Sequence, residues 1–330
     1  MSRADWTIDE LAAGVRAGET RALARAISLL ENGEPSSREL IRVLYADTGR
    51  AHTVGFTGPP GVGKSSLVSA LVAHLRALGK TVGVVSVDPS SPVTRGALLG
   101  DRIRLAEHFL DPDVFIRSMG TRGHVGGLAG STLQTVLLLD AAGKDVVLLE
   151  TVGTGQSEVG VRSIADTVVL TLMPGAGDSI QALKAGIMEI PDVIVINKSD
   201  HPLAKSTAGD VRQMLALTGR DSPPVVLTEA LRGEGVDELW RSIERHRSAL
   251  ASDGRLDERR SSRLAGEVFA LASTEARRHL ENAVAGDPEL LRLLDEVRQR
   301  KLDPLTAVHD ILQKVFHIGD DELQGNTDPR

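Results

Sequence analysis

The chain has 330 residues, and its 45 acidic against 38 basic residues give a formal net charge of −7. It contains no cysteine, which excludes disulfides, thiolate nucleophiles and cysteine-based zinc sites. The net negative charge does not favour binding to a nucleic acid or to an acidic membrane surface. Aromatic residues, at 2%, are too few to stack on nucleic-acid bases. No apolar run approaches the length that spans a bilayer, and the opening residues do not form a signal peptide. We therefore expect a cytoplasmic protein with no nucleic-acid or membrane partner.

A helical N-terminal extension is expected over residues 1–48. Three segments repeat apolar residues at helical spacing and carry Gly or Ser at their ends: IDELAAGVRAG, TRALARAISLLENG and SSRELIRVLYAD. The period then changes, because the chain from Thr53 onward alternates short β-branched runs with helical segments.

Residues 49–252 contain seven of these β-branched runs, which together predict an α/β domain. They are HTVGFTG, KTVGVVSVD, DVFIRSMG, DVVLLET, DTVVLTLM, DVIVINK and PPVVLTE. Each run is apolar throughout instead of alternating, as is typical of strands covered by helices on both faces. The pattern therefore predicts a parallel sheet flanked by helices.

Residues 253–330 are expected to form a helical C-terminal arm. The polar, glycine-bearing stretch SDGRLDERR predicts a break, after which helical periodicity returns and continues to the tail GDDELQGNTDPR, which is expected to fray. An apolar stripe follows the arm through Leu264, Val268, Leu271, Leu290, Leu293, Leu294 and Val297. Such a stripe needs a surface to cover, which is either the chain's own α/β domain or a partner.

A phosphate-binding loop is predicted between the first strand and the helix that follows it. The stretch fits G-x-x-x-x-G-K-[ST] and lies directly after an apolar strand and before an amphipathic helix. Its residues are Gly58, Pro59, Pro60, Gly61, Val62, Gly63, Lys64 and Ser65, with Ser66 beside them in the same cradle. Backbone N–H groups and the helix dipole would hold the phosphates. Lys64 is expected to reach the β- and γ-phosphates, and Ser65 to ligate Mg²⁺.

The base is indicated by a second motif, N-K-x-D, at the end of a later strand. Its residues are Asn197, Lys198, Ser199 and Asp200. The carboxylate of Asp200 can accept hydrogen bonds from the guanine N1–H and exocyclic amine, a donor pair that adenine lacks. A third segment stands where guanine-binding loops typically have Ser-Ala, and its residues are Glu229, Ala230 and Leu231. With Glu229 in place of the serine, a backbone contact to the guanine oxygen can persist, but the side-chain contribution is in question.

Carboxylates for a metal are expected at the same edge of the sheet. Asp88 ends the run TVGVVSVD and Glu150 ends DVVLLE, so both should emerge beside the phosphates. Glu150 also begins an acidic-x-x-Gly segment, in which the N–H of Gly153 would sense the γ-phosphate. Asp101 is less specific, since an isolated acid at a polar helix start is more often a solvated cap.

Together these motifs resemble the MeaB/ArgK family of P-loop GTPases, relatives of the methylmalonic aciduria type A protein. The resemblance runs through most of the chain and rests on the segments GPPGVGKSSL, VDPSSPVTRGALLGDRIR, SMGTRGHVGGLA, ETVGTGQSE, MPGAGDSIQALKAG and NKSD, in this order. It implies a GTPase chaperone of adenosylcobalamin-dependent methylmalonyl-CoA mutase, which assists cofactor loading and protects the mutase. It also implies a homodimer joined through the C-terminal arm.

The resemblance further implies roles for single residues. Lys64, Asp88, Asp101 and Glu150 match the family's lysine and acids that serve the phosphates and Mg²⁺. The segment from Met173 to Lys184 corresponds to a switch in which Gln181 and Lys184 act in partner-stimulated hydrolysis. Glu229 is the main departure from the family pattern.

Hydrolysis by the isolated protein is expected to be slow. Positioning and electrostatic stabilisation carry most of phosphoryl transfer, but the attacking water must also be oriented. No glutamine directly follows Gly153, so Gln156 or Gln181 would have to be brought in when a partner orders the switches.

Two other functions stay open. A small-substrate kinase of a transport system would bind adenine and release a phosphorylated product, and Asp200 speaks against it. A metal-insertion GTPase would share both nucleotide motifs, but it needs a Cys- or His-rich metal segment that this chain lacks.

Overall fold

The structure, a computed structural model, describes residues 6–88, 105–120, 127–151, 157–175, 191–217 and 222–317. Five of the residues discussed above lie outside these ranges: Asp101, Gly153, Gln156, Gln181 and Lys184. The chain divides into two units, Met1–Glu267 and Val268–Arg330. In the described ranges, no helix is long and apolar enough to cross a membrane.

Seven parallel strands form the centre of the first unit. They are β1 (His52–Thr57), β2 (Val82–Asp88), β3 (Val114–Gly120), β4 (Val146–Thr151), β5 (Thr167–Leu172), β6 (Val193–Asn197) and β7 (Val225–Thr228). Their order is β3-β2-β4-β1-β5-β6-β7, and every neighbouring pair is parallel. All seven predicted strands and the parallel α/β fold are thus confirmed. Because β1 lies between β4 and β5, the chain leaves β1 at a point where later strands depart to both sides, the usual place of a ligand in open α/β sheets.

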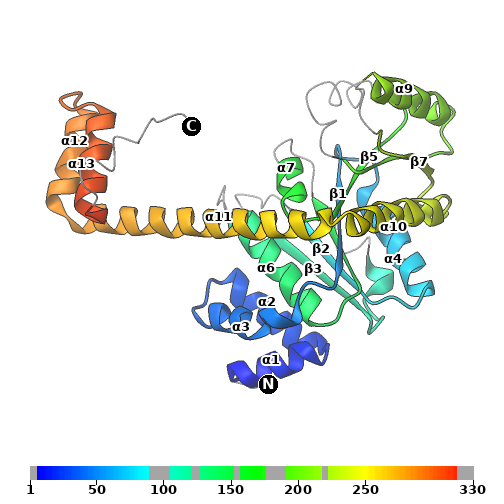
Figure 1. Ribbon diagram of the computed structural model, residues 1–330, viewed down its shortest axis with the longest axis horizontal. Helices are drawn as coiled ribbons and strands as arrows, with labels where there is room; N and C mark the ends of the chain where they lie inside the picture. Colours follow the sequence, from blue (N-terminus) through cyan, green and yellow to red (C-terminus); the bar gives the residue numbers. More distant parts are fainter. Residues whose placement is uncertain are drawn as a thin grey trace. The chain divides into compact units, whose positions relative to one another are not determined.

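Helices cover both faces of this sheet (Figure 1). On one face, α4 (Lys64–Ala77) and α10 (Val236–Ser252) pack on Val54 and Phe56 of β1 and on the central valines. On the other face lie α6 (Gly127–Ala141), α7 (Ser157–Arg162) and α9 (Ala204–Ala216). The inner strands β1, β4, β5 and β6 are therefore buried on both sides, which explains why their sequences are apolar without alternation, whereas the edge strands β3 and β7 are only partly buried.

The N-terminal helices form a further layer over α6 (Figure 1). They are α1 (Ile8–Arg16), α2 (Thr20–Glu31) and α3 (Ser36–Leu44), followed by a short turn of 3₁₀ helix at Tyr45–Asp47. Their leucines and alanines share one apolar core with α6 and with the sheet. An ion pair between Glu31 of α2 and Arg117 of β3 adds a polar link to the edge of the sheet. All three predicted helices are present, while the domain boundary at residue 48 stays a prediction.

The C-terminal part consists of three helices, α11 (Arg255–Gly286), α12 (Pro288–Arg298) and α13 (Pro304–Phe316). The predicted break over SDGRLDERR was too long, because only Asp253 and Gly254 separate α10 from α11. Asp287 and Asp303 cap α12 and α13, each ahead of a proline. Lys314 of α13 forms an ion pair with Asp287, the N-cap residue of α12, at 2.7 Å, and this contact joins the two helices.

Arginines in the first turns of α11 bind the amino edge of the sheet. Arg260 donates to both oxygens of Asp166, at 3.1 and 2.7 Å, and Arg263 donates to Asp166 Oδ1 at 2.6 Å. Arg259 binds Asp192 at 3.1 Å. Burial raises the pKa of Asp166, but the hydrogen bond from Arg260 and the charges of both arginines outweigh burial and hold the pKa below its usual value. The arginines therefore compensate a buried charge.

Candidate nucleotide site

The predicted phosphate loop joins the end of β1 to the start of α4. Gly61 and Gly63 both have left-handed backbone, with φ of 79° and 93°, which favours glycine. Gly63 is the N-cap residue of α4, and no side chain caps the helix there. The N-terminus of α4 thus presents backbone N–H groups and the positive end of its dipole toward the loop, as an anion site requires.

Lys64 lies folded over the loop that precedes it. Its Nζ donates to the carbonyl oxygen of Gly58 at 2.7 Å and to that of Pro59 at 3.0 Å. The side chain is buried, with 6% of the residue exposed. An ammonium group on a flexible stem can exchange these carbonyls for phosphate oxygens by rotation. The loop therefore holds its cation ready at the place where phosphates would lie.

Ser65 and Glu150 meet beneath this loop. Ser65 Oγ donates to Glu150 Oε1 at 2.5 Å, and both residues are buried. Glu150 comes from β4, where it pairs in register with Phe56 of β1 and Ser86 of β2. Asp88 is the last residue of β2, two strands from β1, so its backbone ends at the same edge. The Ser65 hydroxyl and the Glu150 carboxylate thus lie together at the edge where β2 also ends.

Asn197 connects the phosphate loop to the predicted guanine loops. Its Nδ2 donates to the carbonyl oxygen of Val62 at 2.9 Å, and its Oδ1 accepts from Thr228 Oγ1 at 3.1 Å and from the N–H of Ala230 at 3.2 Å. Asn197 is 2% exposed. Sequence reasoning assigned Asn197 to the base motif and missed this structural role.

Lys198 and Asp200 follow Asn197 on the outer side of the site. Lys198 has a φ of 60°, and its Nζ donates to the carbonyl oxygen of Gly61 at 3.0 Å. The same Nζ lies 3.6 Å from Met173 Sδ. Asp200 is exposed. The predicted guanine motif therefore contacts the phosphate loop and leaves the Asp200 carboxylate open to solvent.

Glu229 is accommodated by a partner that the sequence reading did not identify. Its Oε1 lies 3.1 Å from Arg232 Nε, and its backbone N–H donates to the carbonyl oxygen of Glu234 at 3.0 Å. Ala230 is buried beside Asn197, whereas Leu231 is 89% exposed. The turn therefore neutralises the glutamate that stands in place of a serine and keeps its backbone beside the N-K-x-D loop.

The sequence of this chain matches the model of a known protein family. The model described as "Methylmalonyl Co-A mutase-associated GTPase MeaB" matches residues 23–285. The chain belongs to the MeaB family of GTPases. The resemblance inferred from the motifs is thus confirmed, and with it the assignment as a P-loop GTPase. The individual residue roles stay predictions.

Relatives span nearly the whole MeaB-family chain. A putative GTPase of Pyrococcus abyssi is 45% identical over 318 residues, which cover 94% of this chain and 98% of the relative. The GTPase ArgK of Escherichia coli is 34% identical, with 92% and 96% covered. The mouse protein named methylmalonic aciduria type A homolog, mitochondrial, is 32% identical, with 94% and 79% covered. A crystal structure titled LAO/AO transport system kinase superposes with a TM-score of 0.70 at 28% identity, covering 96% of this chain and 99% of the other.

The contact between Gly63 and Asn197 can be tested with a matched pair of substitutions. A Cβ at Gly63 would lie 2.5 Å from Asn197 Nδ2, whereas a Cβ at Gly61 would meet nothing within 4 Å. Gly61→Ala introduces strain in left-handed backbone and should lower the free energy of unfolding by about 1–2 kcal/mol. Gly63→Ala should lower it by roughly 1–3 kcal/mol more, because the new Cβ displaces Asn197 and leaves its buried partners unsatisfied. Urea unfolding and calorimetric GDP binding measure both, and equal losses in the two variants would contradict the proposed role of Asn197.

Proposed function

We propose that this MeaB-family GTPase binds and hydrolyses GTP at the carboxyl edge of the sheet, with Lys64, Ser65 and Glu150 serving the phosphates. The observation that carries the proposal is the convergence of three features at one point. Lys64 lies over the phosphate loop, Ser65 binds Glu150 at 2.5 Å, and Asn197 joins this loop to the guanine loops. This point lies at the carboxyl ends of the strands, where ligands of open α/β sheets bind.

The donor set also fits Mg²⁺. A serine hydroxyl and a carboxylate oxygen are the hard ligands that Mg²⁺ prefers alongside phosphate oxygens and water. Ser65 and Glu150 would hold the ion, with Asp88 and Asp101 as further candidate ligands; Asp101 lies outside the described residues. When bound, Mg²⁺ supplies neutralisation of the charge that develops on the β- and γ-phosphates.

Hydrolysis then depends mainly on how the chain positions the phosphates. On GTP binding, Lys64 would rotate from the carbonyls of Gly58 and Pro59 to the β–γ bridge, where its charge stabilises the departing diphosphate. The N–H groups at the start of α4 would hold the β-phosphate, and Gly153 would respond to the γ-phosphate. A water must still be aligned, and we assign this to Gln156 or Gln181 once a partner orders them. Turnover by the protein alone is therefore slow.

Selection of guanine is assigned to Asp200, helped by the backbone of the turn at Glu229, Ala230 and Leu231. Asp200 is exposed and can receive the N1–H and amine of the base. Lys198 bonds to Gly61, so the base loop and the phosphate loop are positioned together. This coupling sets the spacing between base and phosphates.

The first test concerns the base. GDP at a hundredfold excess over its Kd should raise the free energy of unfolding by about 2.7 kcal/mol, and ADP should raise it far less. Asp200→Asn should weaken GDP binding by about 1.5–3 kcal/mol through loss of a charged acceptor, and favour xanthine nucleotides. Asp210→Asn, an exposed acid on α9, is the matched control and should bind GDP normally. Equal stabilisation by ADP would favour the transport-kinase alternative instead.

We further propose that the GTPase serves an adenosylcobalamin-dependent methylmalonyl-CoA mutase as a chaperone for cofactor loading and protection. The support is the family's description and the name of the mouse relative. A chain of contacts also connects the phosphate loop to the expected switch, because Lys198 Nζ contacts Met173 Sδ and donates a hydrogen bond to Gly61 of the phosphate loop. The switch expected over residues 173–184 therefore begins at a residue that touches the nucleotide machinery.

Partner stimulation provides the second test. Gln181→Ala and Lys184→Ala should leave GTP hydrolysis by the protein alone nearly unchanged, since these residues are proposed to act only after a mutase orders them. Stimulation by the mutase should fall about tenfold or more, as expected for loss of a group that positions a proton-transferring water. Lys205→Ala, which removes an exposed cation on α9, is the control. Hydrolysis indifferent to every such mutase would overturn the chaperone proposal and leave the GTPase assignment intact.

We also propose that the chain forms a homodimer through its C-terminal arm. Within the second unit, α11, α12 and α13 enclose an apolar groove of about 430 Å³, lined among others by Val284, Leu294 and Ile311. Val268 and Phe269 of α11 are 64% and 73% exposed. Exposed apolar surface of this kind marks an interaction site.

Two truncations test the arm. A chain ending at Glu267 keeps Arg259, Arg260 and Arg263, so it should stay folded, bind GDP and sediment as a monomer, whereas the full chain sediments as a dimer. A chain ending at Ser252 loses the charged hydrogen bonds from these arginines to Asp166 and Asp192, and its free energy of unfolding should drop by about 1.5–3 kcal/mol. A monomeric full-length chain at micromolar concentration would refute dimerisation, and equal stability of the two truncations would refute the role of the arginines.

A further inference from the structure

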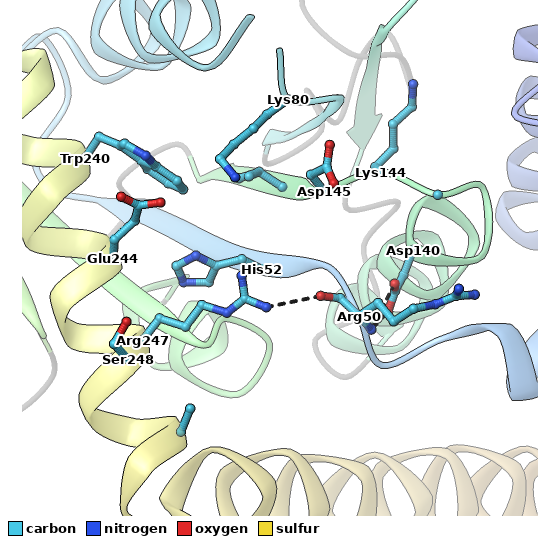
Figure 2. A pocket seen from close by; sticks show the side chains of 13 residues that line it. Arg50, His52, Lys80, Asp140, Lys144, Asp145, Trp240, Glu244, Arg247 and Ser248 are labelled. Atoms are coloured by element: carbon cyan, nitrogen blue, oxygen red, sulfur yellow. Dashed lines mark hydrogen bonds between the residues drawn. The ribbon is translucent and has the colours of Figure 1, made fainter. Parts of the chain in front are cut away.

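A second cavity lies at the amino edge of the sheet, opposite the edge that carries the phosphate loop. It occupies about 730 Å³, a volume typical of small-molecule sites. Its walls are the residues that precede β1, β2 and β4 together with one side of α10. Figure 2 shows the side chains of α10 projecting toward His52 at the start of β1. None of the motifs that assign the GTPase activity lies here.

Four cations line this cavity, and none of them forms an ion pair with a described carboxylate. Arg247 Nη2 donates to the carbonyl oxygen of Arg50 at 3.2 Å (Figure 2), and Arg50 Nη2 donates to that of Asp47 at 2.8 Å. Lys144 Nζ donates to the carbonyl oxygen of Asp113 at 3.1 Å. Lys80 Nζ lies 6.0 Å from the centre of the Trp240 ring. The four positive charges are therefore held by neutral groups.

Three carboxylates line the cavity beside the four cations, so its formal net charge is +1. Asp140 accepts the N–H groups of Gly49, at 2.5 Å, and Ala51, at 2.9 Å. Asp145 accepts the N–H of Thr81 at 2.7 Å and its hydroxyl at 2.9 Å. Both carboxylates are thus already engaged in fixing the strand ends. Glu244, exposed on α10, is the remaining acid among the lining residues.

Two ring nitrogens in the wall are buried and have no hydrogen-bond partner. They are His52 Nδ1 and Trp240 Nε1, and their residues are 0% and 3% exposed. Burial lowers the pKa of His52 to about 3, so its imidazole is neutral. The indole N–H is a donor only, and it requires an acceptor to offset its desolvation. Buried polar groups are usually paired in folded proteins.

We propose that this cavity binds a phosphate-bearing small molecule, at a site separate from the GTP site. Several unpaired cations around one space match the multiple charge of a phosphate ester or diphosphate better than a single carboxylate. Arg50 and Arg247 offer planar guanidinium donors suited to phosphate oxygens. The Trp240 ring, with Lys80 beside it, offers an apolar wall to the rest of the ligand.

Lys144 contributes less to this charge than the other three cations. Its side chain is buried, and burial lowers its pKa although the charges of Asp113, Asp111 and Asp145 act in the opposite direction. The cations that an anionic ligand would meet are therefore Arg50, Lys80 and Arg247.

The fluorescence of Trp240 can be used to measure ligand binding in the cavity. The chain has two tryptophans, so Trp6→Phe leaves Trp240 as the single indole of the full-length protein. With the GTP site saturated by GDP and free Mg²⁺ held constant, inorganic pyrophosphate should change Trp240 fluorescence in a saturable manner. Chloride at equal ionic strength should not. A fluorescence change that follows ionic strength alone would overturn the proposal.

Charge variants then distinguish a built site from general attraction. The double variant Lys80→Gln with Arg247→Gln should weaken pyrophosphate binding about tenfold or more, equivalent to loss of roughly 1.4 kcal/mol or above. Arg245→Gln removes an exposed cation from the same helix outside the cavity and should have little effect. Glu244→Gln should tighten binding by removing the uncommitted acid. Equal weakening by Arg245→Gln, or unchanged affinity in both the double variant and Glu244→Gln, would refute the site.

Discussion

The side-chain amide of Asn197 joins the loops to which we assign nucleotide binding. One end donates to the phosphate loop and the other accepts from β7 and from the turn that follows it. Because the residue is buried, these bonds are shielded from water and fix the distances between loops far apart in the sequence. A base loop and a phosphate loop that are tied together in advance need not be ordered by the nucleotide itself, which lowers the entropic cost of binding.

Three polar side chains of the same edge are already bonded before any nucleotide arrives. Lys64 bonds to loop carbonyls, Ser65 bonds to Glu150, and Lys198 bonds to Gly61. A nucleotide must therefore replace existing bonds, so that only a ligand with correctly placed phosphates gains net free energy. Selectivity arises in part from this exchange, since a poorly matched ligand leaves buried donors or acceptors unpaired.

Much of the fold and of the phosphate loop could be predicted from the sequence because their signals are local. Strands buried on two faces are continuously apolar, and the glycines between β1 and α4 follow a fixed spacing. What the sequence could not predict depends on contacts between distant residues. The start of α11 reads as a polar break, because the carboxylates that bind its arginines come from around β5 and β6. The amino-edge cavity likewise draws its wall from residues 50 to 251. The pair of Arg232 and Glu229 is local, but it depends on the geometry of a turn that the residue types alone do not specify.

The arginine contacts of α11 bear on how the chain is made. Asp166 finds its partners 94 and 97 residues later, and Asp192 finds Arg259 after 67. All seven strands have been synthesised before these arginines are added, so the acids at the amino edge lack their partners until then. Contacts of such long sequence separation form late, so a nascent chain holds an incomplete sheet edge until Arg263 has been synthesised. Completion of the GTPase unit is thus tied to arrival of the helix that leads into the arm.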